Sequence, residues 1–187
     1  MKRKINIIII NGRPRSGKDT VIDLMRKYCL MNECARFRAY STIDPVKDVL
    51  KKLGWNGEKT DEVRNILASL KQFWINNNNG PLKYCIDIIV GRMTSNDTDD
   101  DVLVFQIREP NEIKKLINVL EPIKSVYGLN VSTLFVHRFS ANGEAYGNSA
   151  DANVADYEYS DEIFNTGTLE QLERNVYEYM NELLEVR

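Results

Sequence analysis

The chain has 187 residues, 43% of them hydrophobic and 28% charged, which suits one folded domain with a sizeable core and excludes disordered and fibrous classes. The formal net charge of −2 gives no global preference for nucleic acid or membranes, and the apolar run Ile7–Ile10 is too short to span a bilayer. The three cysteines, Cys29, Cys34 and Cys85, show no metal-ligand spacing, which favours reduced thiols and a cytoplasmic location.

The first predicted element is a strand over Lys4–Asn11, a continuous β-branched run that ends in Asn-Gly. Such a run without alternation is typical of a strand buried on both faces of a parallel sheet. A helix is predicted over Lys18–Leu30, because apolar residues recur there at helical spacing. The next helix is expected over Asp44–Leu53, with Asp44 as the N-cap, a proline in the first turn and Gly54 as the stop.

The rest of the chain continues the alternation of strands and helices. The acidic stretch Asn96–Asp101 is expected to be a solvated surface loop, and Ser140–Ala155 a long loop that is functional or disordered. Strands are expected over Ala35–Tyr40, Val102–Ile107, Val131–His137 and Glu162–Asn165, and helices over Asp61–Ile75, from Pro81 through Met93, over Asn111–Leu120 and over Thr168–Leu184. This alternation predicts an α/β domain with a parallel sheet and right-handed crossovers.

The segment Gly12–Thr20 carries the strongest chemical signal. It reads Gly-Arg-Pro-Arg-Ser-Gly-Lys-Asp-Thr and matches the phosphate-binding loop (P-loop) pattern G-x4-G-K, between a predicted strand and a predicted helix as that loop requires. Gly12 and Gly17 permit unusual backbone angles and let main-chain N–H groups approach a phosphate. The helix N-terminus adds its positive end, and Lys18 can reach the β- and γ-phosphates of ATP. The alternative is an ordinary strand-to-helix turn that contains two glycines.

Three other side chains of this segment, Arg13, Arg15 and Asp19, have two interpretations each. Arg13 and Arg15 can stabilise charge on a transferred γ-phosphoryl group, or they are exposed surface cations. Asp19 stands where a Ser or Thr usually ligates Mg²⁺. Asp19 can hold the ion directly or through water, or Thr20 supplies the hydroxyl. Otherwise Asp19 is a first-turn acid favoured by the helix dipole.

Four stretches of the sequence resemble P-loop small-molecule kinases. The loop Arg15–Asp19 resembles that of phage deoxynucleoside monophosphate kinase and animal-type phosphomevalonate kinase, which also place Asp after the lysine. Ser41–Lys47 resembles the acceptor-facing segment of this group, and Val102–Glu109 resembles its strand that ends in Asp-Thr-Arg. Ser160–Leu172 resembles the last strand and helix of nucleoside monophosphate and dephospho-coenzyme A kinases.

The resemblance implies a three-layer P-loop NTPase fold: a five-stranded parallel sheet of order 2-3-1-4-5 with helices on both faces. It implies one kinase domain over residues 1–187, with an acceptor-binding helical insert at about 42–95 and a lid at about 139–160. It also implies ATP and Mg²⁺ as cofactors, and phosphoryl transfer to a phosphorylated small molecule. A nucleoside or deoxynucleoside monophosphate is the preferred acceptor, and phosphomevalonate is an alternative.

The resemblance also implies roles for single residues. Phosphoryl transfer is assigned to Lys18, Arg13, Arg15 and Arg108; nucleotide binding to Gly12, Ser16, Gly17, Lys18, Asp19, Thr20, Asn165 and Gly167; acceptor binding to Lys47, Arg92, Arg108 and Arg138; and Mg²⁺ to Asp19 or Thr20. Asn165 and Gly167 match the turn beside the adenine. Plainer interpretations remain open: Lys47 and Arg92 can be solvated, and Arg108 can pair with a nearby acid.

Two features of the sequence depart from the pattern of these kinases. The third predicted strand carries Gln106 where an Asp would orient Mg²⁺, and no Lys or Arg occurs from Phe139 to Glu173, where lids carry arginines. A nucleotide-binding regulatory protein with weak or no kinase activity is therefore an alternative. The only histidine, His137, ends a predicted strand and is expected to be structural. The small-molecule acceptor is the expected partner, without nucleic acid or membrane, in a monomer or a homodimer.

Overall fold

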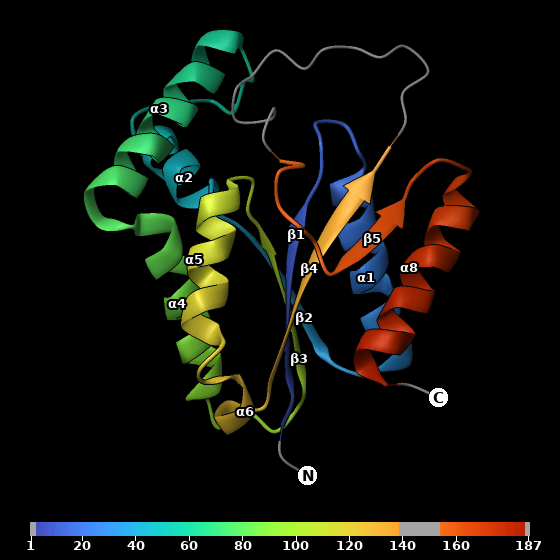
Figure 1. Ribbon diagram of the computed structural model, residues 1–187. Helices are drawn as coiled ribbons and strands as arrows, with labels where there is room; N and C mark the ends of the chain where they lie inside the picture. The colour runs from blue at the N-terminus through green and yellow to red at the C-terminus, as the bar shows by residue number, and fades with distance from the viewer. Residues whose placement is uncertain (1–2, 139–153, 186–187) are drawn as a thin grey trace. The chain divides into compact units, whose positions relative to one another are not determined.

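The computed structural model describes residues 3–138 and 154–185, and its centre is a five-stranded parallel sheet (Figure 1). The order of the strands is β2-β3-β1-β4-β5, as predicted. β1 pairs in parallel with both β3 and β4, and β4 pairs in parallel with β5. The strands span β1 Ile5–Asn11, β2 Arg36–Ser41, β3 Asp101–Gln106, β4 Leu129–His137 and β5 Asp161–Phe164.

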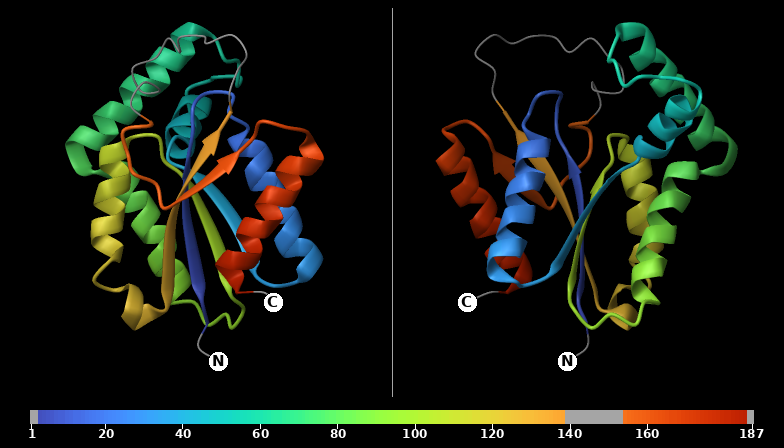
Figure 2. Two further views of the ribbon diagram at one scale, coloured as in Figure 1. Left: turned by 45° about the vertical axis from the view of Figure 1, so that its right-hand side comes forward. Right: turned by 180° about the vertical axis from the view of Figure 1, so that it is seen from behind.

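Helices cover both faces of this sheet. α1 (Lys18–Asn32) and α8 (Leu169–Leu184) lie side by side on one face, and α5 (Pro110–Leu120) lies on the other, followed by the short α6 (Lys124–Tyr127) (Figures 1 and 2). All seven residues of β1 are buried, as expected of a central parallel strand. Ile8 and Ile10 of β1 join the core between the sheet and the helices α1 and α8. Each such side chain contributes about 1.5–3 kcal/mol relative to an exposed one.

The chain divides into two compact units. One unit consists of residues 1–39 and 96–187 and holds most of the sheet with α1, α5, α6 and α8. The other, Tyr40–Ser95, holds three helices, α2 (Asp44–Lys52), α3 (Asp61–Asn78) and α4 (Gly80–Met93). Within the second unit Thr60 caps α3 by accepting from Val63 N at 3.2 Å. This unit spans nearly the same residues as the predicted insert, whose acceptor-binding role stays a prediction.

Two local predictions are wrong. Asp44 is not the N-cap of α2, because Ile43 holds that position; the Asp44 carboxylate instead accepts from Ser41 N at 3.2 Å and from Lys47 Nζ at 2.8 Å. Asp101 is not part of a solvated loop. It is the first residue of β3, is fully buried, and pairs with Arg3 and, at 2.9 Å, with Arg38. Two cations from neighbouring segments satisfy its carboxylate, which the sequence alone did not show.

The structure adds one short helix to the predicted elements and leaves one predicted segment outside the described residues. The short helix α6 was not predicted; it is a single turn, with Gly128 as its C-cap before β4. Residues 139–153 lie outside the described residues. They include most of the predicted lid, at about 139–160, and most of the predicted loop Ser140–Ala155. Among the helices that the structure describes, none is sufficiently long and apolar to cross a membrane.

Candidate functional site

The loop between β1 and α1 has an open main-chain geometry at the helix start. A turn forms where Ser16 N donates to Arg13 O at 3.1 Å, and α1 begins at Lys18 with Gly17 as its N-cap. Gly17 has no side chain that could cap this N-terminus. The first-turn N–H groups of a helix lack partners within the helix, and together with the helix dipole they favour an anion.

Gly12 and Gly17 are required by this geometry. Gly12 has φ +152°, and a Cβ there would lie 2.6 Å from Val136 O of β4. Gly17 has φ +91°, and a Cβ there would lie 2.3 Å from Asn165 Nδ2. Both distances are shorter than a carbon atom can adopt without displacing its neighbour. The two glycines therefore allow β4 and the residue after β5 to pack directly against the loop.

The ammonium group of Lys18 lies across the loop that it follows. Its Nζ donates to Gly12 O at 2.6 Å and to Arg13 O at 3.0 Å. Both acceptors are main-chain carbonyls at the start of the loop, so the positive charge is held within the loop. A polyphosphate in the same loop would offer oxygen acceptors of full negative charge, which bind an ammonium group more strongly than neutral carbonyls do.

Ser16 is buried, with 1% of its surface exposed. Its hydroxyl has no hydrogen-bond partner among the residues that the structure describes. A buried hydroxyl without a partner costs about 1–3 kcal/mol, so this atom is available to a ligand oxygen. The Ser16 main-chain oxygen, in contrast, accepts from Asn165 Nδ2 at 2.9 Å.

Asn165 and Gly167 follow β5, in the turn that was predicted to lie beside the adenine. The structure places the Asn165 side chain directly against the P-loop, on Ser16 and Gly17. Gly167 lies under the Gln171 carboxamide, because a Cβ there would come within 1.8 Å of Gln171 Oε1. Gln171 and Thr168 form the capping box of α8, which fixes this turn. Contact of the turn with a base stays a prediction.

The other loop side chains face solvent. Arg13, Arg15, Asp19 and Thr20 are all exposed. Arg15 adopts the left-handed backbone conformation, with φ 61°, and its carbonyl accepts from Arg138 Nη1 at 3.4 Å. The structure thus brings the side chain of Arg138, which follows β4, to the P-loop. These cations surround the loop without occupying it, which leaves them available for an anionic ligand.

The residues that follow β3 reach the same edge of the sheet. Gln106 ends β3 and lies beside Ile10 of β1 in the register. Arg108 is exposed, and its carbonyl accepts from Asn11 Nδ2 at 3.1 Å. The carboxyl ends of parallel strands are where open α/β sheets bind their ligands. Arg108 therefore joins Arg13, Arg15 and Lys18 at this edge.

Lys47 and Arg92 belong to the second unit. Lys47, in α2, is half-buried and pairs with Asp44 at 2.8 Å, so it is not simply solvated. Arg92 lies in the last turn of α4 and is also partly buried. Their predicted role in binding an acceptor is not tested by the arrangement within this unit.

Sequence reasoning missed two residues of the site, Asn11 and Tyr159. Asn11 ends β1 and is fully buried; its Oδ1 accepts from Gly12 N at 2.8 Å and its Nδ2 donates to Tyr159 Oη at 2.8 Å. The signal for Asn11 was a polar residue directly after the apolar run Ile7–Ile10 of a buried strand, because a buried amide requires partners. Nothing local in the sequence marks Tyr159, which is 148 residues away.

His137 lies at the end of β4 in an aromatic group. Its ring stacks on Phe164 at 4.6 Å with an interplanar angle of 9°, and Phe135 packs edge-on against it at 4.7 Å. Its Nε2 lies 3.4 Å from Glu162 Oε1. This packing agrees with the structural role that was expected.

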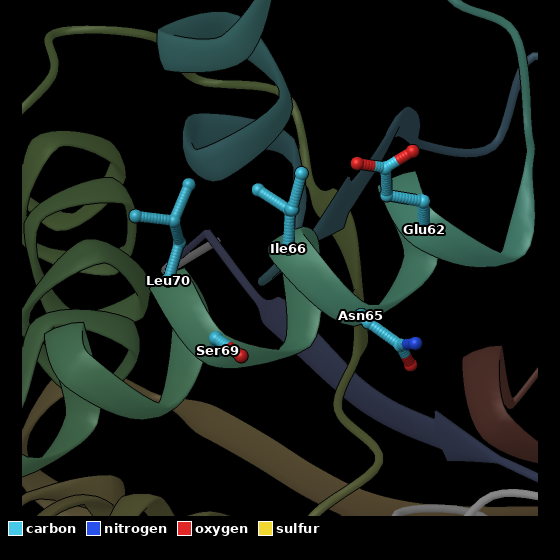
Figure 3. Close-up of a pocket in the computed structure, with 5 residues that line it drawn as sticks. All are labelled: Glu62, Asn65, Ile66, Ser69 and Leu70. Carbon is cyan, nitrogen blue, oxygen red and sulfur yellow. The ribbon is translucent and has the colours of Figure 1, made fainter.

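A separate hollow lies on the second unit. It has a volume of about 590 Å³ and is lined by five residues of α3: Glu62, Asn65, Ile66, Ser69 and Leu70 (Figure 3). In Figure 3 the side chains of Ile66 and Leu70 extend on one side of the helix. None of the predicted site residues lines it. In the described part of the chain, no group of three or more His, Cys, Asp or Glu is arranged to hold a metal ion.

Comparison with known proteins identifies the fold. No protein-family model matches the sequence, and no curated protein matches it significantly. Solved structures do match over almost the whole chain. The APS kinase CysC of Mycobacterium tuberculosis in complex with AMPPNP and APS aligns with a TM-score of 0.53 and 12% identity over 99% of both chains.

The chain has the fold of P-loop kinases. A Cys556Ala mutant of the same APS kinase aligns with a TM-score of 0.50 and 11% identity over 99% of both chains. The protein APE1195 aligns with a TM-score of 0.54 and 14% identity over 98% of both chains. At identities of 11–14%, these alignments show the fold alone. The resemblance to phage deoxynucleoside monophosphate kinase or phosphomevalonate kinase stays a prediction from the sequence.

Proposed function

We propose that the protein is an ATP-dependent phosphotransferase that acts on a phosphorylated small molecule. The observation that carries this proposal is the geometry of the P-loop: an uncapped helix N-terminus, two glycines without room for a Cβ, and the Lys18 ammonium held across the loop. This combination of main-chain N–H groups, helix dipole and lysine suits the β- and γ-phosphates of a nucleoside triphosphate.

The residues of the loop fit ATP in three ways. The N–H groups at the start of α1 would bind phosphate oxygens, and the buried Ser16 hydroxyl would gain a partner. Lys18 would exchange its two carbonyl contacts for phosphate oxygens. The ammonium group would then face oxygens of opposite full charge in place of neutral carbonyls, and this added Coulomb attraction favours the bound state.

The first turn of α1 also fits Mg²⁺. Asp19 and Thr20 are exposed there and carry the oxygen donors that this ion prefers. Mg²⁺ retains waters and binds mainly through substrate phosphates, so one or two protein oxygens suffice. When bound, the ion would neutralise charge on the phosphates. Gln106 could contribute only a neutral amide oxygen at the end of β3.

The transfer step needs positive charge around the γ-phosphoryl group. The bond from phosphorus to the β–γ bridging oxygen breaks, an acceptor oxygen forms a new bond to phosphorus, and ADP leaves. In this proposal Lys18, Arg13 and Arg15 stabilise the negative charge on the equatorial oxygens. Arg138, whose guanidinium contacts the carbonyl of Arg15, supplies a cation where the loop before β5 has none.

The acceptor that we favour is a nucleoside or deoxynucleoside monophosphate, giving ADP and a nucleoside diphosphate. Arg108, two residues beyond β3, would bind its phosphate, and the sequence resemblance assigns the same role to Lys47 and Arg92. Support comes from the sequence resemblance in Ser41–Lys47 and Val102–Glu109. The complex of the APS kinase with AMPPNP and APS is an example of this fold with a nucleotide and an anionic second ligand together.

The direct test is ADP release in a coupled assay over a panel of ribo- and deoxyribonucleoside monophosphates, phosphomevalonate and APS. We expect ADP release to depend on one acceptor class and to be lost in Lys18→Ala. Turnover on phosphomevalonate alone would keep the phosphotransferase and reject the nucleotide acceptor. If bound ATP is not consumed with any acceptor, the phosphotransferase proposal is wrong.

A second candidate function is a regulatory protein that binds a nucleotide without transferring a phosphoryl group. Gln106 favours it, because a neutral amide replaces the carboxylate expected at the end of β3. This candidate predicts that ATP raises the melting temperature while ATP is not consumed. Lys18→Ala would abolish the stabilisation under both functions, so turnover alone separates them.

A further inference from the structure

A buried hydrogen-bond network centred on Asn11 joins the P-loop to residues that precede β5. Asn11 has no exposed surface. Its Oδ1 accepts from Gly12 N at 2.8 Å, and its Nδ2 donates to Arg108 O at 3.1 Å and to Tyr159 Oη at 2.8 Å. Both N–H groups and the oxygen of the amide are thereby used, so the orientation of the side chain is fixed.

Tyr159 extends this network to the start of its own segment. Its hydroxyl accepts from Asn11 and donates to the carbonyl of the fully buried Val154 at 2.8 Å. The ring packs against Phe135 at 4.9 Å and against Tyr157 at 5.0 Å. Burial raises the pKa of Tyr159, so the hydroxyl stays protonated and remains a donor to Val154.

The network ends on Gly12, the first of the two P-loop residues that have no side chain to hold them. Gly12 has φ +152° and lies against Val136 O, so rotation of its peptide would move the mouth of the loop. The Asn11 oxygen restrains that peptide through the Gly12 N–H group. Because the network is buried, loss of one member leaves other polar groups unpaired, and the cost spreads along the connected bonds.

We infer that Asn11 and Tyr159 are positioning residues that couple the segment Val154–Tyr159 to the first glycine of the P-loop. One consequence rests on the proposed function: the position of this segment should alter the affinity of the protein for ATP. Neither side chain is expected to touch the phosphates. The same coupling can be measured at the main-chain amides of the loop without any nucleotide.

The test uses the full-length protein with Tyr159→Phe, which removes the hydroxyl and keeps the ring. Tyr157→Phe is the matched control, because it removes a neighbouring hydroxyl that makes no hydrogen bond within the described residues. Hydrogen exchange of residues 11–17 is measured without nucleotide, and the Kd for ATP by calorimetry. In Tyr159→Phe we expect exchange about fivefold faster or more and a Kd about tenfold higher; in Tyr157→Phe we expect neither.

A second variant approaches the same bond from its other end. Asn11→Ser no longer reaches Tyr159. In the double variant the rise in Kd should be smaller than the product of the two single rises, because both variants remove the Asn11–Tyr159 hydrogen bond. If Tyr159→Phe lowers the melting temperature but leaves exchange of the loop unchanged, the inference is wrong and the role is only structural. If wild-type protein fails to bind ATP, the proposed function is wrong, and the exchange comparison still decides the inference.

Discussion

The side-chain amide of Asn165 donates to the main-chain oxygen of Ser16 at 2.9 Å and closes the P-loop from the side of β5. The two residues are 149 positions apart in the chain. They meet because β1 and β5 have only one strand, β4, between them in the sheet. Gly17 makes it possible, since any Cβ at that position would collide with the same amide. The geometry of the loop thus depends on the last strand as well as on the motif.

Removal of this contact should weaken nucleotide binding. In Asn165→Ala the loop loses one hydrogen bond, worth about 0.5–1.5 kcal/mol, so the Kd for ATP should rise by roughly three- to tenfold. The control is Asn175→Ala in α8, whose amide donates to Phe164 O at 3.4 Å and not to a residue of the loop. Calorimetric titration with ATP measures both. Equal effects of the two variants would show that Asn165 does not act through the loop.

Gly17→Ala should impair binding more than its backbone conformation alone explains. The variant meets both the left-handed φ of +91° and the collision with Asn165 Nδ2. Gly54→Ala is a close control, because Gly54 has φ +98° and nothing within 4 Å of an added Cβ. Both should lose about 1–3 kcal/mol of stability from strain, and only Gly17→Ala should also lose ATP affinity. Addition of Asn165→Ala should relieve part of the extra destabilisation in Gly17→Ala, as chemical denaturation can show.

Asp101→Asn should be strongly destabilising. The carboxylate is fully buried and pairs with Arg3 and Arg38, and removal of one partner of a buried pair costs about 3–5 kcal/mol. Asp99→Asn is the matched change on an exposed acid that pairs with Arg36 at 2.7 Å, and it should cost less than about 1 kcal/mol. Urea denaturation of the two variants compares these values. Similar losses would mean that the buried group does not stabilise β3.

Stability should decrease at alkaline pH in part through Cys29. Burial, followed by the nearby Cys34, raises the pKa of this thiol to about 12. The folded-state pKa lies above the unfolded value of about 8.5, so the contribution is complete below pH 8.5 and is lost between about 8.5 and 12. The free energy of unfolding should therefore decline less between pH 8 and 10 in Cys29→Ala than in wild type, although Cys29→Ala is less stable at pH 7. Parallel declines would contradict this assignment.

The sequence predicted the elements of the fold more fully than the contacts of the site. The β-branched run at Ile5–Asn11 and the helical spacing after Lys18 are local patterns, and both elements form as predicted. The contacts of Asn165 with the P-loop, and of Asp101 with Arg3, join residues about 150 and 98 positions apart. No local propensity encodes such contacts, because they depend on the order of strands in the sheet and on burial.

Asp44 shows the same limit on a smaller scale. An acid before proline is a common start of a helix, and α2 does begin there. The side chain nevertheless caps the end of β2 through Ser41 N and pairs with Lys47, since Ile43 takes the N-cap position. The sequence therefore predicted the helix and misassigned the hydrogen bonds of its first residue.

In the proposed function, the P-loop binds the polyphosphate of ATP with Lys18 at its mouth. Isothermal titration of ATP with Mg²⁺ into wild type and Lys18→Ala tests it most directly, with Lys51→Ala as a control on an exposed lysine of α2. We predict saturable binding to wild type and to Lys51→Ala, and a Kd at least about a hundredfold higher in Lys18→Ala, because charged hydrogen bonds worth about 1.5–3 kcal/mol each are lost. Equal affinity of wild type and Lys18→Ala, or no binding to wild type, would contradict the account.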